Sequence, residues 1–338
     1  MNESSLQFLI CPNCQSDDLD LETFSDRHGE VWDGRLVCGS CSNWYRIERG
    51  IVDLLSLSLR RNDLYRSFAE KYELPYSDAE HDDPNLDQKL GQINFFIGDV
   101  DAYEKQVDNF SLSKALDRIS FDKLQAVLGP GDLLLTVGCG QGRQSNRAAE
   151  KGYTVIGVDI CEEMLRRGKE LAAERGVQAK IDFIVGDAEN IPVKDSIFKA
   201  CLINGALHHF PSPGEAIKVA STKLRPGGSI YTMDPHDSPV RFVFDLMMKV
   251  WKLYDEEAND DPLISEEKLL HWHEQAGIEA NTRLSTYLPP HLFVPLSPSL
   301  SNSLLAISDR MFNRIPYVRK LGGVIFSEGK KIQSTSPN

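Results

Sequence analysis

The chain has 338 residues, more than one compact core usually holds, so we expect one large domain and a smaller one. The formal net charge of −13 at pH 7 repels phosphate backbones on average and disfavours an RNA substrate, although a local basic patch could still bind one. No apolar run reaches about 18 residues, so no membrane span is expected. The polar N-terminus lacks the features of a secretory signal, which predicts a cytoplasmic protein with reduced thiols.

Two Cys-x2-Cys pairs near the N-terminus form the first candidate site, namely Cys11 with Cys14 and Cys38 with Cys41. Four thiolates in two such turns suit the tetrahedral all-cysteine site of structural Zn2+. A β-rich ribbon over residues 1–56 would bury too little core to be stable alone, so the metal would supply much of its folding free energy. Four sulfurs leave no position for water, which indicates a structural or recruiting site and not a catalytic one.

The remaining chain is predicted to contain a helical linker or cap over residues 57–130, and then an alternation of strands and helices over residues 131–331. Such alternation is typical of a parallel sheet. We therefore expect an α/β domain with a Rossmann-like, seven-stranded, mostly parallel sheet and helices on both faces. Residues 332–338 are expected to be a frayed tail. The predicted strands lie at 133–137, 154–159, 181–187, 200–204, 229–233, 279–288 and 323–330.

A glycine turn follows the first of these strands. Gly138, Gly140 and Gly142 let the backbone approach a ligand, and the helix that begins after them offers unpaired N–H groups. Dinucleotide-dependent dehydrogenases favour Gly-x-Gly-x-x-Gly, whereas the third glycine here comes one residue early, which favours a methyltransferase. Asp159, at the end of the next strand, is placed to accept hydrogen bonds from ribose hydroxyls, a requirement of both cofactors.

Five motifs occur in the order found in class I S-adenosylmethionine-dependent methyltransferases, and from about residue 129 to 330 the chain resembles that family in its quinone-biosynthesis and natural-product branches. The motifs lie at 137–142, 158–165, 186–192, 204–210 and 224–228. The resemblance implies S-adenosyl-L-methionine as cofactor, with Asp159 on the ribose, Met164 on the adenine ring and Asp187 on the adenine amino group. It assigns cofactor binding to Gly138, Cys139, Gly140, Gly142, Asp159, Ile160, Met164, Asp187, Ala188 and Asn204.

One residue departs from the family pattern. Thr136 stands where most relatives carry an acidic residue that helps to organise the methionine amine of the cofactor. The ribbon, in turn, resembles the small zinc-ribbon activator proteins that partner tRNA and rRNA methyltransferases. The family also places an acceptor lid in the region that corresponds to residues 238–277 and 289–320.

Transfer to a hydroxyl acceptor needs a base, and His208 and His209 are the candidates, because histidine titrates near neutral pH and the fourth strand ends toward the cofactor. A structural role for either histidine remains the alternative. We expect a small, hydrophobic or natural-product-like acceptor. Two alternatives stay open, an RNA methyltransferase that recruits its substrate through the ribbon, and an inactive methyltransferase fold that docks a protein partner through the ribbon.

Overall fold

The computed structural model describes residues 1–109, 111–251, 253 and 263–332. The chain divides into two compact units, which we call the first unit (1–97 with 130–198) and the second unit (98–129 with 199 onward). Residues 252, 254–262 and 333–338, which belong to the predicted lid and tail, lie outside the described residues. The domain boundaries expected from the sequence stay a prediction.

The first unit begins with the ribbon, an antiparallel meander that follows a 3-10 turn, η1 (Glu3–Phe8). Its strands are β1 (Leu19–Arg27), β2 (Glu30–Cys38), β3 (Trp44–Glu48) and β4 (Ile51–Asp53), paired in that order. Arg49 and Gly50 have φ values of +51° and +73°, the left-handed conformations that a two-residue hairpin turn requires. The meander is therefore set by local turns.

Three parallel strands follow, in the order β7-β6-β5: β5 (Leu133–Val137), β6 (Thr154–Asp159) and β7 (Ile181–Val185). Each is a nearly continuous apolar run, as expected for parallel strands covered on both faces. β4 pairs in parallel with β7 through Val52 and Ile184. The ribbon is thus an extension of the sheet.

A glycine and acidic residues mark where two of the helices of the first unit begin. They are α1 (Asn62–Lys71), the beginning of α2 (Leu86–Asn109), α4 (Arg143–Glu150) and α5 (Glu162–Glu174), with short 3-10 turns η2 (Leu57–Leu59) and η3 (Gln178–Lys180). α4 starts directly after Gly142, where an added Cβ would lie 2.5 Å from the Phe183 ring. Two acidic residues in the first turn of α5 complement the positive end of its dipole.

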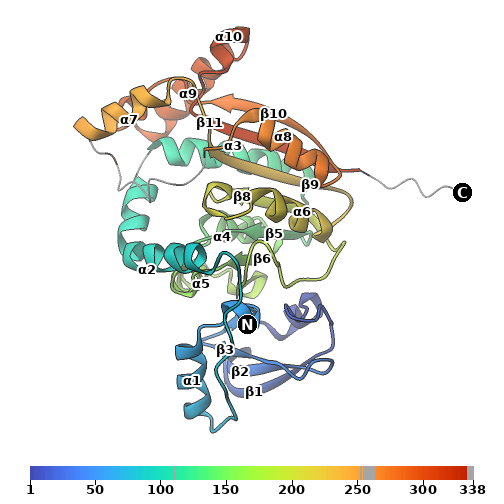
Figure 1. Ribbon diagram of the computed structural model, residues 1–338. Helices are drawn as coiled ribbons and strands as arrows, with labels where there is room; N and C mark the ends of the chain where they lie inside the picture. The colour runs from blue at the N-terminus through green and yellow to red at the C-terminus, as the bar shows by residue number, and fades with distance from the viewer. Residues whose placement is uncertain (110, 252, 254–262, 333–338) are drawn as a thin grey trace, which may run out of the picture. The chain divides into compact units, whose positions relative to one another are not determined.

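The second unit joins helices to the strands β8-β9-β11-β10 (Figure 1). β11 pairs antiparallel with both β9 and β10. The core of the second unit includes a cluster of Leu112, Ala115, Leu116, Phe293, Leu305 and Phe326. Its elements are α3 (Ser111–Val127), β8 (Phe198–Asn204), η4 (Leu207–His209), α6 (Pro213–Lys223), β9 (Leu224–Pro235), α7 (Arg241–Val250), α8 (Glu266–Gln275), β10 (Ile278–Ser285), η5 (Pro290–Phe293), α9 (Pro298–Phe312), α10 (Pro316–Arg319) and β11 (Val324–Lys331).

The α/β architecture is confirmed, and the seven strands predicted within residues 131–331 are present as β5–β11, but the sheet as a whole is larger and more mixed than expected. The described residues form eleven strands, and the strand pairing is mixed. The added strands belong to the ribbon, where hairpin turns impose antiparallel pairing, and β10 and β11 are also antiparallel. Among the residues that the structure covers, no helix combines the length and the apolar character needed to cross a bilayer.

Candidate functional site

The glycine turn between β5 and α4 is held by a carboxylate. Gly138, Gly140 and Gly142 have φ values of +61°, +51° and +66°, which side chains other than glycine adopt only at a cost. The Gly140 N–H donates to Asp159 Oδ2 at 2.7 Å, and the Cys161 N–H donates to Asp159 Oδ1 at 2.9 Å. Asp159 therefore fixes the turn against the beginning of α5.

Met164 and the glycine turn come together in the same unit. The Met164 side chain is 2% exposed, and its Cε lies 3.5 Å from the position of a Cβ built on Gly140. Cys139 and Ile160 are half-buried, and Ala188 is buried. The structure thus brings Gly140, Asp159 and Met164 to one place.

Asp187 follows β7 and binds Lys89, a residue that lies outside every sequence motif. Its Oδ2 accepts a hydrogen bond from Lys89 Nζ at 2.8 Å, and the same ammonium lies 3.0 Å from Asp83 and 3.1 Å from Glu189. Burial disfavours the charged form of Lys89, but the hydrogen bond and charge of Asp187 outweigh it and raise the pKa of the lysine. A carboxylate oxygen has two lone pairs, so Lys89 orients Asp187 without using up its capacity to accept.

Thr136 takes part in an internal hydrogen bond. Its Oγ1 lies 2.8 Å from Ser145 Oγ, and both side chains are buried. The hydroxyl pair ties β5 to α4, a role that an acidic side chain at this position would not fill in the same way. The threonine that replaces the family's acidic residue therefore has a hydrogen-bond partner within the fold.

The four cysteines of the ribbon converge. Their Sγ atoms all lie within 4.8 Å of one another, with Cys11 and Cys41 at 3.6 Å and Cys14 and Cys38 at 3.5 Å. A tetrahedron with zinc–sulfur bonds of about 2.3 Å has sulfurs about 3.8 Å apart. The Tyr45 hydroxyl lies 3.1 Å from Cys11 Sγ, the kind of outer contact that orients a metal ligand. The donor set fits a structural zinc ion.

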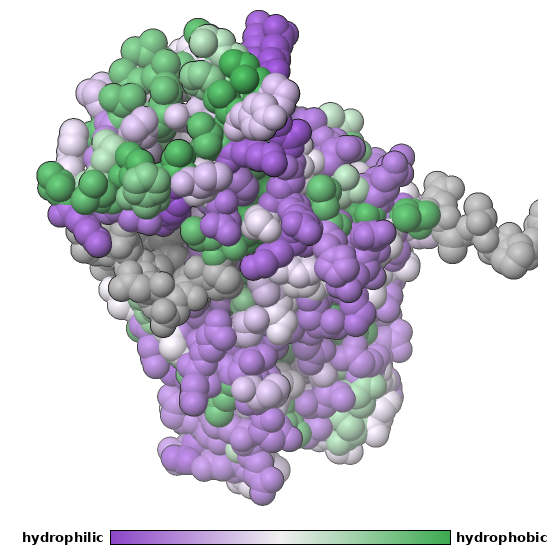
Figure 2. Space-filling view, turned by 45° about the horizontal axis from the view of Figure 1, so that its top comes forward, coloured by the Kyte–Doolittle hydropathy of each residue, from purple (hydrophilic) through white to green (hydrophobic). Residues whose placement is uncertain are grey.

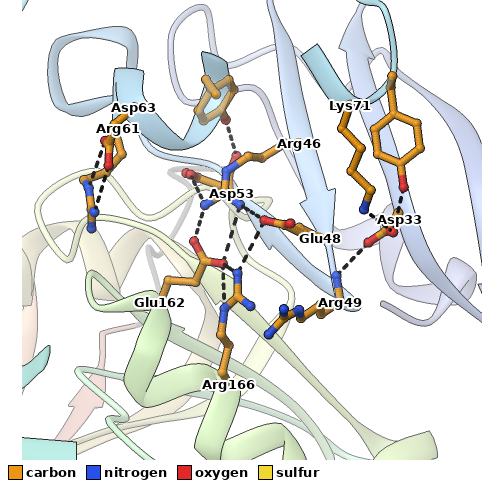
Figure 3. A network of polar contacts seen from close by, with 12 residues as sticks. Asp33, Arg46, Glu48, Arg49, Asp53, Arg61, Asp63, Lys71, Glu162 and Arg166 are labelled. Atoms are coloured by element: carbon orange, nitrogen blue, oxygen red, sulfur yellow. Dashed lines mark hydrogen bonds and ion pairs between the residues drawn. The ribbon is translucent and has the colours of Figure 1, made fainter. Parts of the chain in front are cut away.

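A buried ion network connects the ribbon to α5 (Figure 3). Arg46, on β3, is 1% exposed; its guanidinium contacts Glu48 at 2.8 Å, Asp53 at 3.3 Å, and Glu162. Arg166 also binds Glu162. Burial raises the pKa of Asp53 despite the nearby Arg46, whereas Arg46 and Arg166 outweigh burial at Glu162 and lower its pKa. The first residue of α5 is thus held by the ribbon.

Loss of one zinc ligand should unfold the ribbon. We expect Cys38→Ser to reduce bound zinc from one ion per chain to none and to lower the melting temperature, because the metal supplies much of the folding free energy of such a small module. Metal content and thermal unfolding measure both effects. Cys201→Ala, which removes a buried thiol outside the cluster, should keep its zinc; equal zinc content in Cys38→Ser would refute the site.

Removal of the buried guanidinium should be costly. Arg46→Met leaves the buried Asp53 without its nearest cation and Glu162 with Arg166 alone, and we expect the free energy of unfolding to fall by about 3–5 kcal/mol. Urea denaturation measures this. Arg35→Met, which breaks the exposed pair with Glu22, should cost no more than about 1 kcal/mol. Equal losses in both variants would contradict the assigned role of the network.

The second unit contains the two candidate histidines. His208 Nδ1 lies 2.9 Å from Asp234 Oδ1, and the His208 N–H donates to the same oxygen at 3.3 Å. The rings of His208 and His209 are 3.8 Å apart at their centroids. Asp234 is 1% exposed, and burial raises its pKa while the bond to His208 opposes this. A carboxylate on Nδ1 selects the tautomer in which Nε2 is the basic nitrogen.

Asn204 has its side-chain amide occupied within the second unit. Its Nδ2 donates to Asp117 at 3.2 Å and its Oδ1 accepts from Ser120 at 3.0 Å. Both partners lie on α3, so this helix orients the amide. Sequence analysis missed Asp117, Ser120 and Asp234 as partners, because each lies 26 or more residues from the motif residue that it contacts.

Comparison with known proteins adds three relatives. A family model described as a methyltransferase domain matches residues 135–232. The 27-O-demethylrifamycin SV methyltransferase of Amycolatopsis mediterranei is 32% identical over 126 residues, which cover 36% of this chain and 46% of that protein. The biotin biosynthesis bifunctional protein BioHC of Teredinibacter turnerae is 26% identical over 210 residues, which cover 58% of this chain and 35% of that protein. Demethylmenaquinone methyltransferase of Renibacterium salmoninarum is 30% identical over 167 residues, which cover 47% of this chain and 67% of that protein.

The matches differ in how much of each relative they include. The chain spans less than half the length of the rifamycin and biotin proteins and about two thirds of the menaquinone protein. The segment matched by the family model runs from β5 into β9, so it contains the glycine turn, Asp159 and Asp187. The ribbon lies outside it.

Proposed function

The chain belongs to the class I S-adenosylmethionine-dependent methyltransferases, and from this premise we propose that it methylates a small, hydrophobic or natural-product-like acceptor. The observation that carries the proposal is the glycine turn fixed by Asp159 through Gly140. Relatives whose names include a demethylated rifamycin and a demethylmenaquinone support an acceptor of this class. We also propose that the four-cysteine cluster holds structural Zn2+ and that the protein works in the cytoplasm, where its thiols stay reduced.

In this proposal each motif residue has a binding role. When bound, the cofactor supplies an electrophilic methyl group. Asp159 accepts from the ribose hydroxyls, Met164 packs on the adenine ring, and Asp187, oriented by Lys89, accepts from the adenine amino group. The remaining proposed contacts come from Gly138, Cys139, Gly140, Gly142, Ile160, Ala188 and Asn204.

The His208–Asp234 pair is the proposed base. Methyl transfer to a hydroxyl requires a proton to leave the acceptor oxygen, and Nε2 of His208 can take it while Asp234 stabilises the resulting imidazolium. His209, whose ring is tilted against that of His208, is the second candidate. We rank His208 first because its Nδ1 lies 2.9 Å from Asp234 Oδ1. The ribbon favours the rival proposal of an RNA acceptor, whereas the net charge of −13 disfavours it.

The cofactor site is tested by calorimetric titration with S-adenosylhomocysteine. We expect the wild-type protein to bind it, and Asp159→Asn to bind at least about tenfold more weakly, because hydrogen bonds to a charged acceptor contribute about 1.5–3 kcal/mol each. Asp20→Asn, which changes an exposed carboxylate on β1, should bind as the wild type does. If the folded wild-type protein did not bind, the inactive scaffold would become the better reading.

The base is tested by methyl transfer to a panel of hydroquinones and catechols, measured as release of S-adenosylhomocysteine. We expect His208→Ala to lower kcat by about 10²–10⁴-fold, and His209→Ala by less than about tenfold. The rate should rise with pH as the imidazole loses its proton. Asp234→Asn should move that rise to lower pH, since the anion stabilises the protonated ring. Equal effects of the two histidine variants would exclude His208 as the specific base.

A further inference from the structure

Exposed hydrophobic side chains are concentrated in one part of the second unit (Figure 2). Of fifteen large hydrophobic side chains that are exposed among the described residues, six lie at 240–251 and seven at 292–317. Scattered single residues would need no explanation, but a gathered set of this size indicates a binding surface. We call this set the apolar surface. Its members are Val240, Phe242, Val243, Leu246, Val250, Trp251, Leu292, Val294, Leu300, Ile307, Met311, Ile315 and Tyr317.

α7 is an amphipathic helix whose apolar side faces solvent. Phe242, Leu246 and Val250 recur every four residues and are 69%, 62% and 85% exposed, so they form one stripe along the helix. Met248 is 3% exposed and anchors the opposite side to the unit. A water-soluble surface helix normally has the reverse arrangement.

α9 is apolar on two sides. Leu305 belongs to the core cluster, packed with residues of α3. Leu300, Ile307 and Met311 recur at helical spacing on another side and are 54%, 60% and 57% exposed. The core therefore accounts for only one of the two stripes. Folding of the unit leaves the second stripe without a partner.

α7 and the residue that follows it lie against η5, the turn that precedes α9. Trp251, directly after α7, has its ring centroid 5.2 Å from that of His291 in η5, and its carbonyl oxygen lies 2.7 Å from His291 Nε2. The ring of Phe244, on α7, also contacts His291. η5 leads within a few residues into α9. The exposed stripes of α7 and α9 thus belong to neighbouring segments.

The charge of the α9–α10 segment is opposite to that of the chain. Residues 289–320 carry four basic residues, Arg310, Arg314, Arg319 and Lys320, against one acidic residue, Asp309. Asp309 is itself 1% exposed and paired with Arg283, and Arg319 is paired with Glu266. The whole chain has a net charge of −13. The acidic run 255–261 lies outside the described residues.

We propose that the apolar surface binds the surface of an anionic phospholipid bilayer. Two adjacent amphipathic helices with bulky apolar stripes, an exposed Trp251 and Tyr317, and basic residues along α9 and α10 match the chemistry of the lipid headgroup region, where aromatic rings and cations are favoured. A peripheral contact needs no spanning helix. The proposal goes beyond the methyl-transfer reaction, and its test does not depend on that reaction.

The test is flotation of the full-length protein with vesicles of phosphatidylcholine, with and without about one third phosphatidylglycerol. We expect binding that is at least about tenfold stronger to the anionic vesicles. Leu246→Ser combined with Ile307→Ser should weaken binding to both kinds at least about tenfold, because two large apolar side chains leave the bilayer. Arg314→Gln with Lys320→Gln should remove about fivefold per charge, on the anionic vesicles only.

Two controls distinguish the outcomes. Ile97→Ser changes an exposed apolar residue of the first unit and should bind vesicles as the wild type does. Titration with S-adenosylhomocysteine should give unchanged affinity in the Leu246→Ser, Ile307→Ser variant, which separates this inference from the cofactor site. Absence of vesicle binding by the wild-type protein overturns the proposal, and a dimer in ultracentrifugation that this variant dissociates would identify the occupant as a second copy of the chain.

Discussion

The buried guanidinium of Arg46 is the interaction on which the first unit depends. A cation in a low-dielectric interior is tolerated only where carboxylates surround it. Here those carboxylates come from β3, from the end of β4 and from the first residue of α5. The charge is therefore satisfied only after the ribbon and α5 have both reached their final positions. We therefore expect the helix that carries Met164 and the four-cysteine ribbon to fold cooperatively.

Local patterns predicted the parts of the site that are local in sequence. A buried strand, a glycine turn and a helix follow one another directly, so the turn at Gly138–Gly142 and the strand-end Asp159 could be inferred from residue types alone. Lys89 and Arg46 could not, because their carboxylate partners Asp187 and Glu162 lie 98 and 116 residues away. No period or motif encodes such pairs. They become visible only when the topology places the elements together.

The same distinction explains the sheet. Alternating apolar segments predicted β5, β6 and β7, and the two Cys-x2-Cys pairs predicted a metal-binding ribbon. That β4 would pair with β7 could not be read from either pattern, since three residues of β4 carry too little periodicity. The methyltransferase family model matches residues 135–232, the segment that contains the glycine turn, Asp159 and Asp187. The ribbon and the apolar surface lie outside this segment, and a fold alone does not determine an acceptor.

The pairing of β4 with β7 has a consequence for association between molecules. β7 is buried at all five positions, and without the ribbon its outer side would present unpaired N–H and C=O groups on a mostly apolar strand, a template for strands of other chains. The ribbon replaces that border with β1, which is mostly exposed, charged and irregular near Ser25. Such a strand is a poor template for further pairing. Under the proposal that zinc holds the ribbon together, loss of the metal is expected to expose the border of β7 and to favour aggregation of the protein.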